Sequence, residues 1–257
     1  MAPAVRYGRV KVTGGERWAR LDGDRATLLS SAPWSGGQPT GETVPLASTS
    51  LVCPVAPTTI FGIGRNYRAH AAEMKGSVPT EPMVFTKLVT SLVSPDGTVI
   101  LPKSSSRVDF EAELGVVIGT TCRRVSVTQA LDFVFGYTAL CDVTARDFQK
   151  NDGQWTRAKG SDTFCPVGPA VVRGIDASAL ALSLRQNGEL RQSGSTADMV
   201  FDVAQLVSFI SSFATLSPGD LIATGTPEGV GPLAPGDRIE IAIADIGDLA
   251  FRVAREE

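Results

Sequence analysis

The chain has no long apolar run and no cluster of like charges, and these absences limit what it can be. Nowhere in its 257 residues does an uncharged apolar stretch approach the roughly 20 residues that cross a bilayer, and residues 1–9 lack the apolar run of a signal peptide. Lys and Arg total 24 against 27 Asp and Glu, a net charge of −3 without a basic block. We therefore expect a cytoplasmic protein that binds neither membranes nor nucleic acid.

Cysteine and histidine are scarce, which restricts the metal and redox chemistry available. Four widely spaced cysteines occur, with no CxxC pair and no neighbouring histidine: Cys53, Cys122, Cys141 and Cys165. This spacing favours buried reduced thiols over a disulfide framework or a zinc site. His70 is the only histidine, so general-base chemistry that needs an imidazole must use it.

Glycine and proline are frequent and scattered, which favours a β-rich fold with few helices. The 26 Gly and 16 Pro leave only short apolar runs between them. Residues 5–12 and 18–21 are predicted to form two strands, and residues 30–43 a loop. Apolar residues near position 60 then mark the beginning of a larger domain. We expect a small N-terminal β domain at residues 1–54 and a main domain at residues 55–257.

Three later segments have clear local signals. Apolar residues over 198–213 predict one helix, which Pro218 and Gly219 would stop. An Asn-Gly turn within residues 182–191 predicts a hairpin. Residues 239–253 are predicted to form the closing strands.

Two glutamates and one aspartate form the first candidate site. Along residues 107–119, apolar side chains alternate with Asp109, Glu111 and Glu113, as in a strand with one polar face. Glu111 and Glu113 would then be neighbours roughly 6.5–7 Å apart. Asp142 ends a second, mostly apolar strand over residues 133–142, a costly place for an unpaired carboxylate. Three carboxylates suit a hard divalent cation such as Mg²⁺ or Mn²⁺, whereas the alternative is a solvated strand face paired with Lys or Arg.

The single histidine lies beside an acid. A predicted strand over residues 59–63 leads into a short helix over residues 66–75, on which His70 and Glu73 are i, i+3 neighbours. A carboxylate on one ring nitrogen leaves the other free to take a proton from water. The alternative is a histidine on a helix surface beside a glutamate.

Polar and cationic residues follow directly after Asp142. Arg146 and Gln149 would face one way on a helical turn, and Lys159 would place an ammonium near the metal to stabilise a developing oxyanion. The alternative for residues 145–163 is a solvated loop. A Gly-rich turn at residues 223–231 would bring backbone amides and the Thr226 hydroxyl to an anionic group, although it is not a Walker motif and as a bare pattern is only a turn.

Taken in order, these segments resemble the fumarylacetoacetate hydrolase family. The matching pieces are GRNYRAHAAE at 64–73, DFEAELGVVIG at 109–119, GYTALCDVTARDFQ at 136–149, RAKGSDTFCPVGP at 157–169, Asn187-Gly188 with Arg191-Gln192, and PGDLIATGTPEGVG at 218–231. The similarity covers residues 54–257. The residues before it look like the short leading domain of bacterial members that act on ring-opened aromatic acids.

The resemblance implies a role for each candidate residue. The metal ligands would be Glu111, Glu113 and Asp142, binding Mg²⁺ or Mn²⁺. The water-activating pair would be His70 and Glu73, with Lys159 as the cationic stabiliser. The substrate contacts would be Arg146, Gln149 and Thr226. The implied fold is α+β, a mixed β-roll with helices packed outside and residues 145–163 over the mouth of the site, in a homodimer.

The implied chemistry acts on a small 2-oxo acid. Hydrolytic C–C cleavage of an acylpyruvate, such as a fumarylpyruvate-like 1,3-dicarbonyl acid, uses all of these groups. Two reactions remain as alternatives: decarboxylation of oxaloacetate, and isomerisation of 2-hydroxyhepta-2,4-diene-1,7-dioate in aromatic catabolism. A third alternative is a non-catalytic module that binds a metal or a metabolite, for which the complete set His70, Glu73 and Lys159 would be unnecessary.

Overall fold

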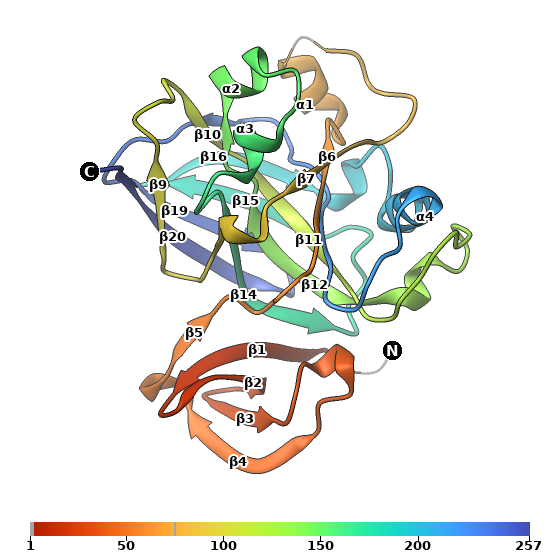
Figure 1. Cartoon of the computed structure of the whole chain (residues 1–257), viewed down its shortest axis with the longest axis vertical. Coiled ribbons are helices and arrows are strands. Elements are labelled where there is room, and N and C mark those ends of the chain that lie inside the picture. Colours follow the sequence, from red (N-terminus) through yellow and green to blue (C-terminus); the bar gives the residue numbers. More distant parts are fainter. Residues whose placement is uncertain (1–2, 75) are drawn as a thin grey trace.

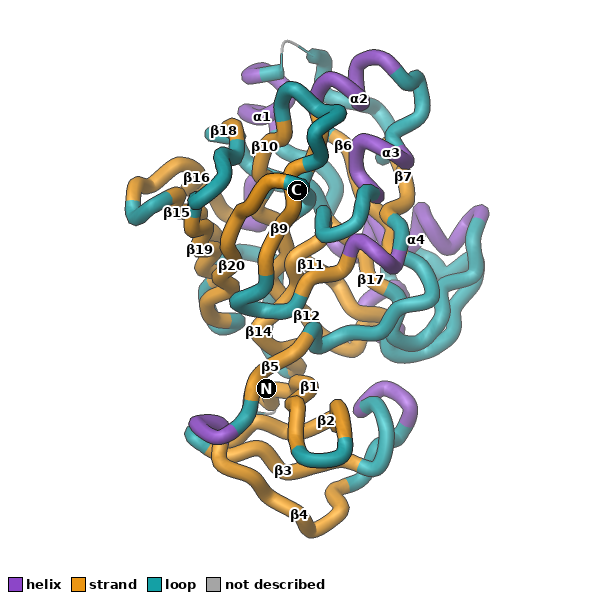
Figure 2. Tube along the Cα trace, turned by 60° about the vertical axis from the view of Figure 1, so that its left-hand side comes forward, coloured by secondary structure: helices purple, strands orange, loops and turns teal. Residues whose placement is uncertain are grey.

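The computed structural model describes residues 3–74 and 76–257, which form twenty strands and four α-helices. The first four strands lie at one end of the molecule, and helices α1, α2 and α3 gather at the other (Figure 1). The same separation is visible from the side in Figure 2. The expected α+β fold, with mostly strands and few helices, is confirmed.

The N-terminal strands form an antiparallel meander. Its members are β1 (Val5–Val12), β2 (Gly15–Asp22), β3 (Arg25–Leu29) and β4 (Pro39–Pro45), and β5 (Ser50–Val52) also pairs with β1. The strands expected at 5–12 and 18–21 are confirmed, but the loop expected over residues 30–43 is wrong. That stretch holds a 3₁₀ turn at Pro33–Ser35 and most of β4. Proline at the ends of β4 is compatible with a strand because β4 lies at the sheet edge.

The same sheet continues into the rest of the chain. From β1 it runs through β14 (Cys165–Arg173), β12 (Val134–Cys141), β11 (Ala112–Ile118), β17 (Leu221–Ala223), β6 (Ile60–Gly64) and β7 (Met83–Lys87), with β8 (Leu92–Val93) paired to β14. Pairing is antiparallel except between β17 and β6 and between β14 and β8.

Two smaller sheets complete the strands. One contains β13 (Thr144–Ala145), β10 (Val108–Phe110) and β18 (Gly231–Pro232). The other contains β16 (Glu189–Ser195), β15 (Ala181–Gln186), β19 (Arg238–Ile243), β20 (Gly247–Arg255) and β9 (Thr98–Leu101). The expected hairpin is β15–β16, whose turn has positive φ at both Asn187 (55°) and Gly188 (84°). The closing strands are β19 and β20.

The helices are short and differ from their expected bounds. They are α1 (Arg68–Glu73), α2 (Arg146–Asn151), α3 (Thr156–Gly160) and α4 (Val203–Phe213), with 3₁₀ turns also at Leu46–Ser48, Val89–Ser91, Ala130–Phe133 and Thr196–Asp198. The helix expected over 198–213 begins only at Val203, because Asp202 and Gln205 form a capping box there. Among the residues described, no helix is long and apolar enough to span a membrane.

Helix α1 is also shorter than the helix expected over residues 66–75. Its start is delayed because the side chain of Asn66 donates to the carbonyl oxygens of Phe201 (2.9 Å) and Thr224 (2.7 Å), which holds the end of β6 in place. The helix ends at Glu73, and the last expected residue, Lys75, lies outside the described residues.

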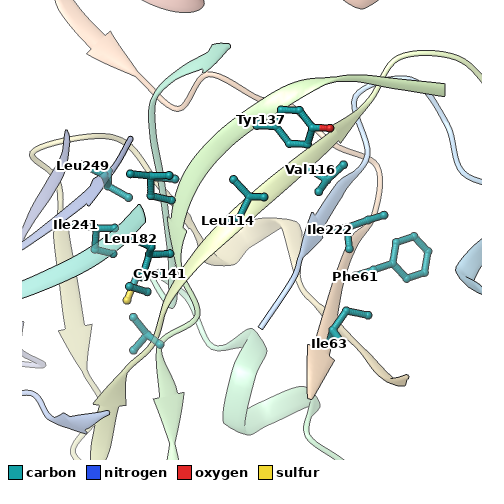
Figure 3. Packing of buried hydrophobic residues seen from close by; sticks show 14 of the residues in the cluster. Phe61, Ile63, Leu114, Val116, Tyr137, Cys141, Leu182, Ile222, Ile241 and Leu249 are labelled. Carbon is teal, nitrogen blue, oxygen red and sulfur yellow. The ribbon is translucent and has the colours of Figure 1, made fainter. Parts of the chain in front are cut away.

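The main core lies between the large sheet and the five-stranded sheet. In Figure 3, side chains from β6, β11, β12 and β17 of the large sheet lie near side chains from β15, β19 and β20. Leu114 and Ile241 illustrate the two sides, and both are fully buried. Burying a side chain of this size stabilises the fold by about 1.5–3 kcal/mol. This packing forms the rigid base on which the polar ends of β11 and β12 lie.

Asp220 provides a test of how the large sheet is held together. Its buried carboxylate accepts hydrogen bonds from the Thr58 hydroxyl (2.7 Å) and the amides of Thr59 (2.9 Å) and Ser217 (2.8 Å). Asp220→Ala is expected to lower the free energy of unfolding by about 2–3 kcal/mol in urea titrations, because these donors lose a charged acceptor. The exposed Asp248 is the matched control, and equal unfolding midpoints for Asp220→Ala and Asp248→Ala would contradict the prediction.

Candidate active site

Two paired strands bring the three expected metal ligands together. Ala112 of β11 pairs with Cys141 of β12, and the amide of Asp142 donates to the carbonyl oxygen of Glu111 at 2.8 Å. One carboxylate oxygen from each of Glu111, Glu113 and Asp142 lies within 4.8 Å of the others. All three residues are buried, which excludes the alternative of a solvated strand face.

The strand that carries the glutamates is interrupted, so the expectation of one continuous strand over residues 107–119 is wrong. β10 ends at Phe110 and β11 begins at Ala112, which leaves Glu111 between them. β10 pairs with β13 and β18, whereas β11 pairs with β12 and β17 of the large sheet. The chain therefore passes from one sheet to another at Glu111, and residues on both faces of both strands are buried.

Cations surround Glu111 and Asp142. The Lys159 ammonium lies 2.7 Å from Glu111 Oε2 and 2.6 Å from Asp142 Oδ2. The Arg146 guanidinium lies 2.6 Å from Glu111 Oε1 and 2.9 Å from Asp109 Oδ2. Burial alone would raise the pKa of Glu111, but Lys159 and Arg146 outweigh it and the pKa lies well below its usual range. Burial alone would lower the pKa of Lys159, but Asp142 and Glu111 raise it overall.

Glu113 is less well compensated than its neighbours. It accepts a hydrogen bond from the Gly225 amide at 2.7 Å, but no salt bridge to it occurs among the described residues. Burial and the nearby carboxylates of Asp142 and Glu111 raise its pKa well above the usual range. A bound divalent cation would favour the ionised form, and the three oxygen donors are those that Mg²⁺ and Mn²⁺ prefer. The residues present therefore fit such an ion.

His70 and Glu73 form the expected pair on α1. Nδ1 of His70 lies 3.1 Å from Oε2 of Glu73, and the other oxygen of Glu73 accepts from the Gly229 amide at 3.1 Å. His70 is only 6% exposed, so the alternative of a surface histidine is wrong. The carboxylate thus orients the ring and links α1 to the loop after β17.

A single cavity of about 630 Å³ connects these groups. Its polar lining includes His70, Glu73, Glu111, Glu113 and Lys159. Ile63, Met74 and Trp155 add apolar surface to the same cavity. The imidazole, the carboxylates and the ammonium therefore face one space large enough for a small organic acid.

Residues 145–163 form part of the cavity wall, and the alternative of a solvated segment holds only for the exposed residues 150–154, 156–157 and 162. Arg146 and Gln149 lie on α2, Lys159 lies on α3, and Trp155 precedes α3. All four line the cavity. Phe85 of β7 packs edge-on against Trp155, with ring centroids 5.4 Å apart, and this contact holds the segment against the large sheet.

The three expected substrate contacts line the cavity but already have protein partners. Arg146 donates to the side-chain oxygen of Gln149 at 3.0 Å. The Thr226 hydroxyl donates to the Ala112 carbonyl oxygen and accepts from Gln192 Nε2, both at 2.8 Å. Their roles toward a substrate stay predictions.

Two buried polar residues near the site were not identified from the sequence. Gln192 accepts from the Ala112 amide at 2.9 Å and so links β16 to the start of β11. Lys87 pairs with Asp142 at 2.5 Å. Gln192 lies in a segment that carries the family resemblance, and this resemblance was the one sequence signal that could have identified Gln192. Lys87 has no local signal, because Asp142 is 55 positions away in the chain.

Metal binding is expected to depend on pH through Glu113. Because burial and the neighbouring carboxylates raise the pKa of Glu113 and favour its protonated form, Mg²⁺ should release protons on binding and bind more tightly as pH rises. A carboxyl group whose pKa is raised in the folded state stabilises the metal-free fold at low pH, and this contribution is lost as pH rises. Bound Mg²⁺ favours the ionised carboxylate, so the increase in Tm on adding Mg²⁺ should grow with pH.

Calorimetry in buffers of different ionisation enthalpy measures this proton release. Glu113→Gln, which has no titrating group at that position, is expected to bind Mg²⁺ more weakly and without the released proton. A binding heat that is the same in every buffer for the unsubstituted protein would contradict the prediction.

Comparisons with known proteins place this geometry in a family. The family model described as fumarylacetoacetate (FAA) hydrolase C-terminal matches residues 59–254, and the model described as Rv2993c-like, N-terminal, matches residues 5–54. Protein Rv2993c of Mycobacterium tuberculosis is 42% identical over 262 residues, covering 98% of this chain and 99% of that protein.

Two further relatives have names that describe an activity. The 2,4-didehydro-3-deoxy-L-rhamnonate hydrolase of a Sphingomonas species is 48% identical over 200 residues, covering 73% of this chain and 70% of that protein. The crystal structure of 2-hydroxyhepta-2,4-diene-1,7-dioate isomerase from Mycobacterium marinum is similar with a TM-score of 0.92 and 41% identity, covering 98% and 99% of the two chains. The chain therefore belongs to the fumarylacetoacetate hydrolase family, as its sequence motifs predicted.

Proposed function

We propose that this family member is a metal-dependent hydrolase that cleaves a C–C bond in an acylpyruvate-type 1,3-dicarbonyl acid such as fumarylpyruvate. The observation that carries the proposal is a single cavity lined by the His70–Glu73 pair, by Glu111 and Glu113 of the carboxylate cluster, and by Lys159. Water activation, ion binding and stabilisation of negative charge all require groups that this cavity provides.

Glu111, Glu113 and Asp142 would hold Mg²⁺ or Mn²⁺. Such an ion supplies a positive charge that polarises the oxygens of a bound 2-oxo acid. The homodimer and the Mg²⁺ or Mn²⁺ cofactor stay predictions that this proposal includes.

His70 would act as the general base. The Glu73 carboxylate accepts a hydrogen bond from Nδ1 of His70, so the other ring nitrogen would take a proton from the attacking water. The water oxygen forms a bond to the acyl carbon, and the bond between that carbon and the methylene group then breaks. The electron pair of the broken bond remains on the three-carbon fragment, which leaves as the enolate of pyruvate.

Lys159 would stabilise the negative charge of that enolate. Its side chain is 3% exposed and its ammonium lies against two carboxylates, which raise the pKa of Lys159 and favour the charged form. Because the surroundings exclude most water, its field is weakly screened at the reacting atoms. The proton that His70 took from the water is then delivered to the enolate carbon to complete pyruvate, and the acyl group, which has gained the hydroxyl of the water, leaves as a carboxylic acid.

A cationic residue in the cavity wall favours a diacid as the substrate. Arg65 lines the cavity, and no carboxylate pairs with it among the residues that the structure describes. Its backbone has φ of 58°, an unfavourable conformation for a residue with a side chain, as is common at functional positions. A second carboxylate on the substrate, as in fumarylpyruvate, would pair with this guanidinium.

Isomerisation is the second candidate, because the structure from Mycobacterium marinum is named as an isomerase of a dienedioate, which is also a diacid. That reaction moves protons along the substrate and needs no attacking water. Decarboxylation of oxaloacetate likewise needs no water. Decarboxylation therefore differs from hydrolysis in its dependence on His70, whereas isomerisation still needs a base that moves the proton.

A substrate panel tests the proposal. Fumarylpyruvate, acetylpyruvate, oxaloacetate and 2-hydroxyhepta-2,4-diene-1,7-dioate are each incubated with Mg²⁺ or Mn²⁺ and, in parallel, with a chelator. We expect loss of fumarylpyruvate with release of equimolar pyruvate, only when metal is present, and slower turnover of the monoacid acetylpyruvate. Conversion of the dienedioate alone would favour the isomerase, and no turnover of any acid would favour the binding module.

Substitution of His70 separates the reactions. His70→Ala is expected to lower kcat for hydrolysis by about 10²–10⁴-fold, because the attacking water loses its base. Oxaloacetate decarboxylation, if present in the unsubstituted protein, should fall much less. Lys159→Met is the comparison, since removal of the ammonium should slow both reactions. Hydrolysis that survives His70→Ala unchanged would exclude this histidine as the base.

A further inference from the structure

Lys87 carries a buried ammonium that the proposed reaction does not use. It is the last residue of β7, and its side chain is 0% exposed. Nζ lies 2.5 Å from Oδ1 of Asp142 and also donates to the main-chain carbonyl oxygen of Lys159. Lys87 is not among the described residues that line the cavity. Lys87 therefore places a buried positive charge beside Asp142, outside the lining of the cavity.

Lys159 binds the other oxygen of the same carboxylate. Its Nζ lies 2.6 Å from Asp142 Oδ2 and 2.7 Å from Glu111 Oε2, and Lys159 lines the cavity. Asp142 is thus paired with two lysines, of which only one reaches the space where a substrate would bind.

We propose that Lys87 is a positioning residue, which holds Asp142 and the main chain of Lys159 in place while the Lys159 ammonium turns toward the substrate. The inference rests on the proposed function. Asp142 is fully buried, and a buried carboxylate that loses its partner becomes a costly unpaired charge. Lys87 prevents this because its own ammonium stays bound to Oδ1. Its bond to the Lys159 carbonyl confines any movement of Lys159 to the side chain.

Lys87→Met tests the inference, because it keeps most of the side-chain length and removes the charge. Loss of a positive charge beside Asp142 should strengthen Mg²⁺ binding to the substrate-free protein by about tenfold in calorimetry. We expect kcat for fumarylpyruvate to fall by about tenfold or more, with KM within about twofold, because Lys159 is no longer held. A folding defect would instead weaken Mg²⁺ binding and lower kcat together.

A double-variant cycle tests whether Lys87 acts through Lys159. In a Lys159→Met background, Lys87→Met should lower kcat by no more than about twofold further, because the group that it positions is already absent. Thr86→Ala, at the exposed neighbouring position of β7, is the matched control and should leave both measurements unchanged.

Several outcomes would overturn the inference. They are an unchanged kcat in Lys87→Met, weaker Mg²⁺ binding, or independent losses in the double variant. If Lys87→Met does not fold, Lys87→Gln replaces it, because glutamine keeps a hydrogen-bond donor without the charge. Lys87→Gln must then bind Mg²⁺ more tightly and have a lower kcat. An unsubstituted protein that turns over no acid contradicts the proposed function, whereas an active one with an unaffected Lys87→Met contradicts this inference alone.

Discussion

A buried carboxylate is costly unless a cation or hydrogen bonds compensate for it, and this chain buries four of them in one small region. Asp109 and Glu111 share Arg146, and Asp142 lies between Lys87 and Lys159. Glu113 is the fourth, and its described hydrogen-bond partner is a single backbone amide. Glu113 is therefore the least compensated of the four carboxylates, and a bound divalent ion would add positive charge beside it.

The loop that follows β17 connects the two halves of the site. The Gly225 amide donates to Glu113, and the Gly229 amide donates to Glu73. Gln192 in turn holds this loop through Thr226 and β11 through the Ala112 amide. Backbone amides of one short segment therefore place the acid that orients the imidazole relative to the carboxylate cluster. The position of His70 depends on strand pairing as much as on its own helix.

Local sequence patterns were sufficient where the interacting residues are close along the chain. Period-2 alternation indicated that Glu111 and Glu113 lie close together, and i, i+3 spacing indicated the contact of His70 with Glu73. The predicted helix extended too far because apolar residues precede Asp202, and the capping box that Asp202 forms with Gln205 was not recognised in the sequence.

Where partners are distant, the sequence held no comparable signal. Lys87 meets Asp142 although β11, β17 and β6 lie between β7 and β12 in the sheet, so no pairing of neighbouring strands signals this contact. The interruption at Glu111 depends on which strands pair with β10, information that alternation does not contain. Likewise, β4 is a strand because β3 pairs with it, although its composition is typical of a loop.

The continuous sheet gives the leading strands a protective role. β14 pairs with β12 on one side and with β1 on the other, so the first strand occupies the hydrogen-bonding edge that β14 would otherwise present to solvent. An uncovered edge of this kind recruits strands from other molecules and promotes aggregation. A homologue without these leading residues would have to shield the same edge by other means, such as a loop, an inserted charge or a neighbouring subunit.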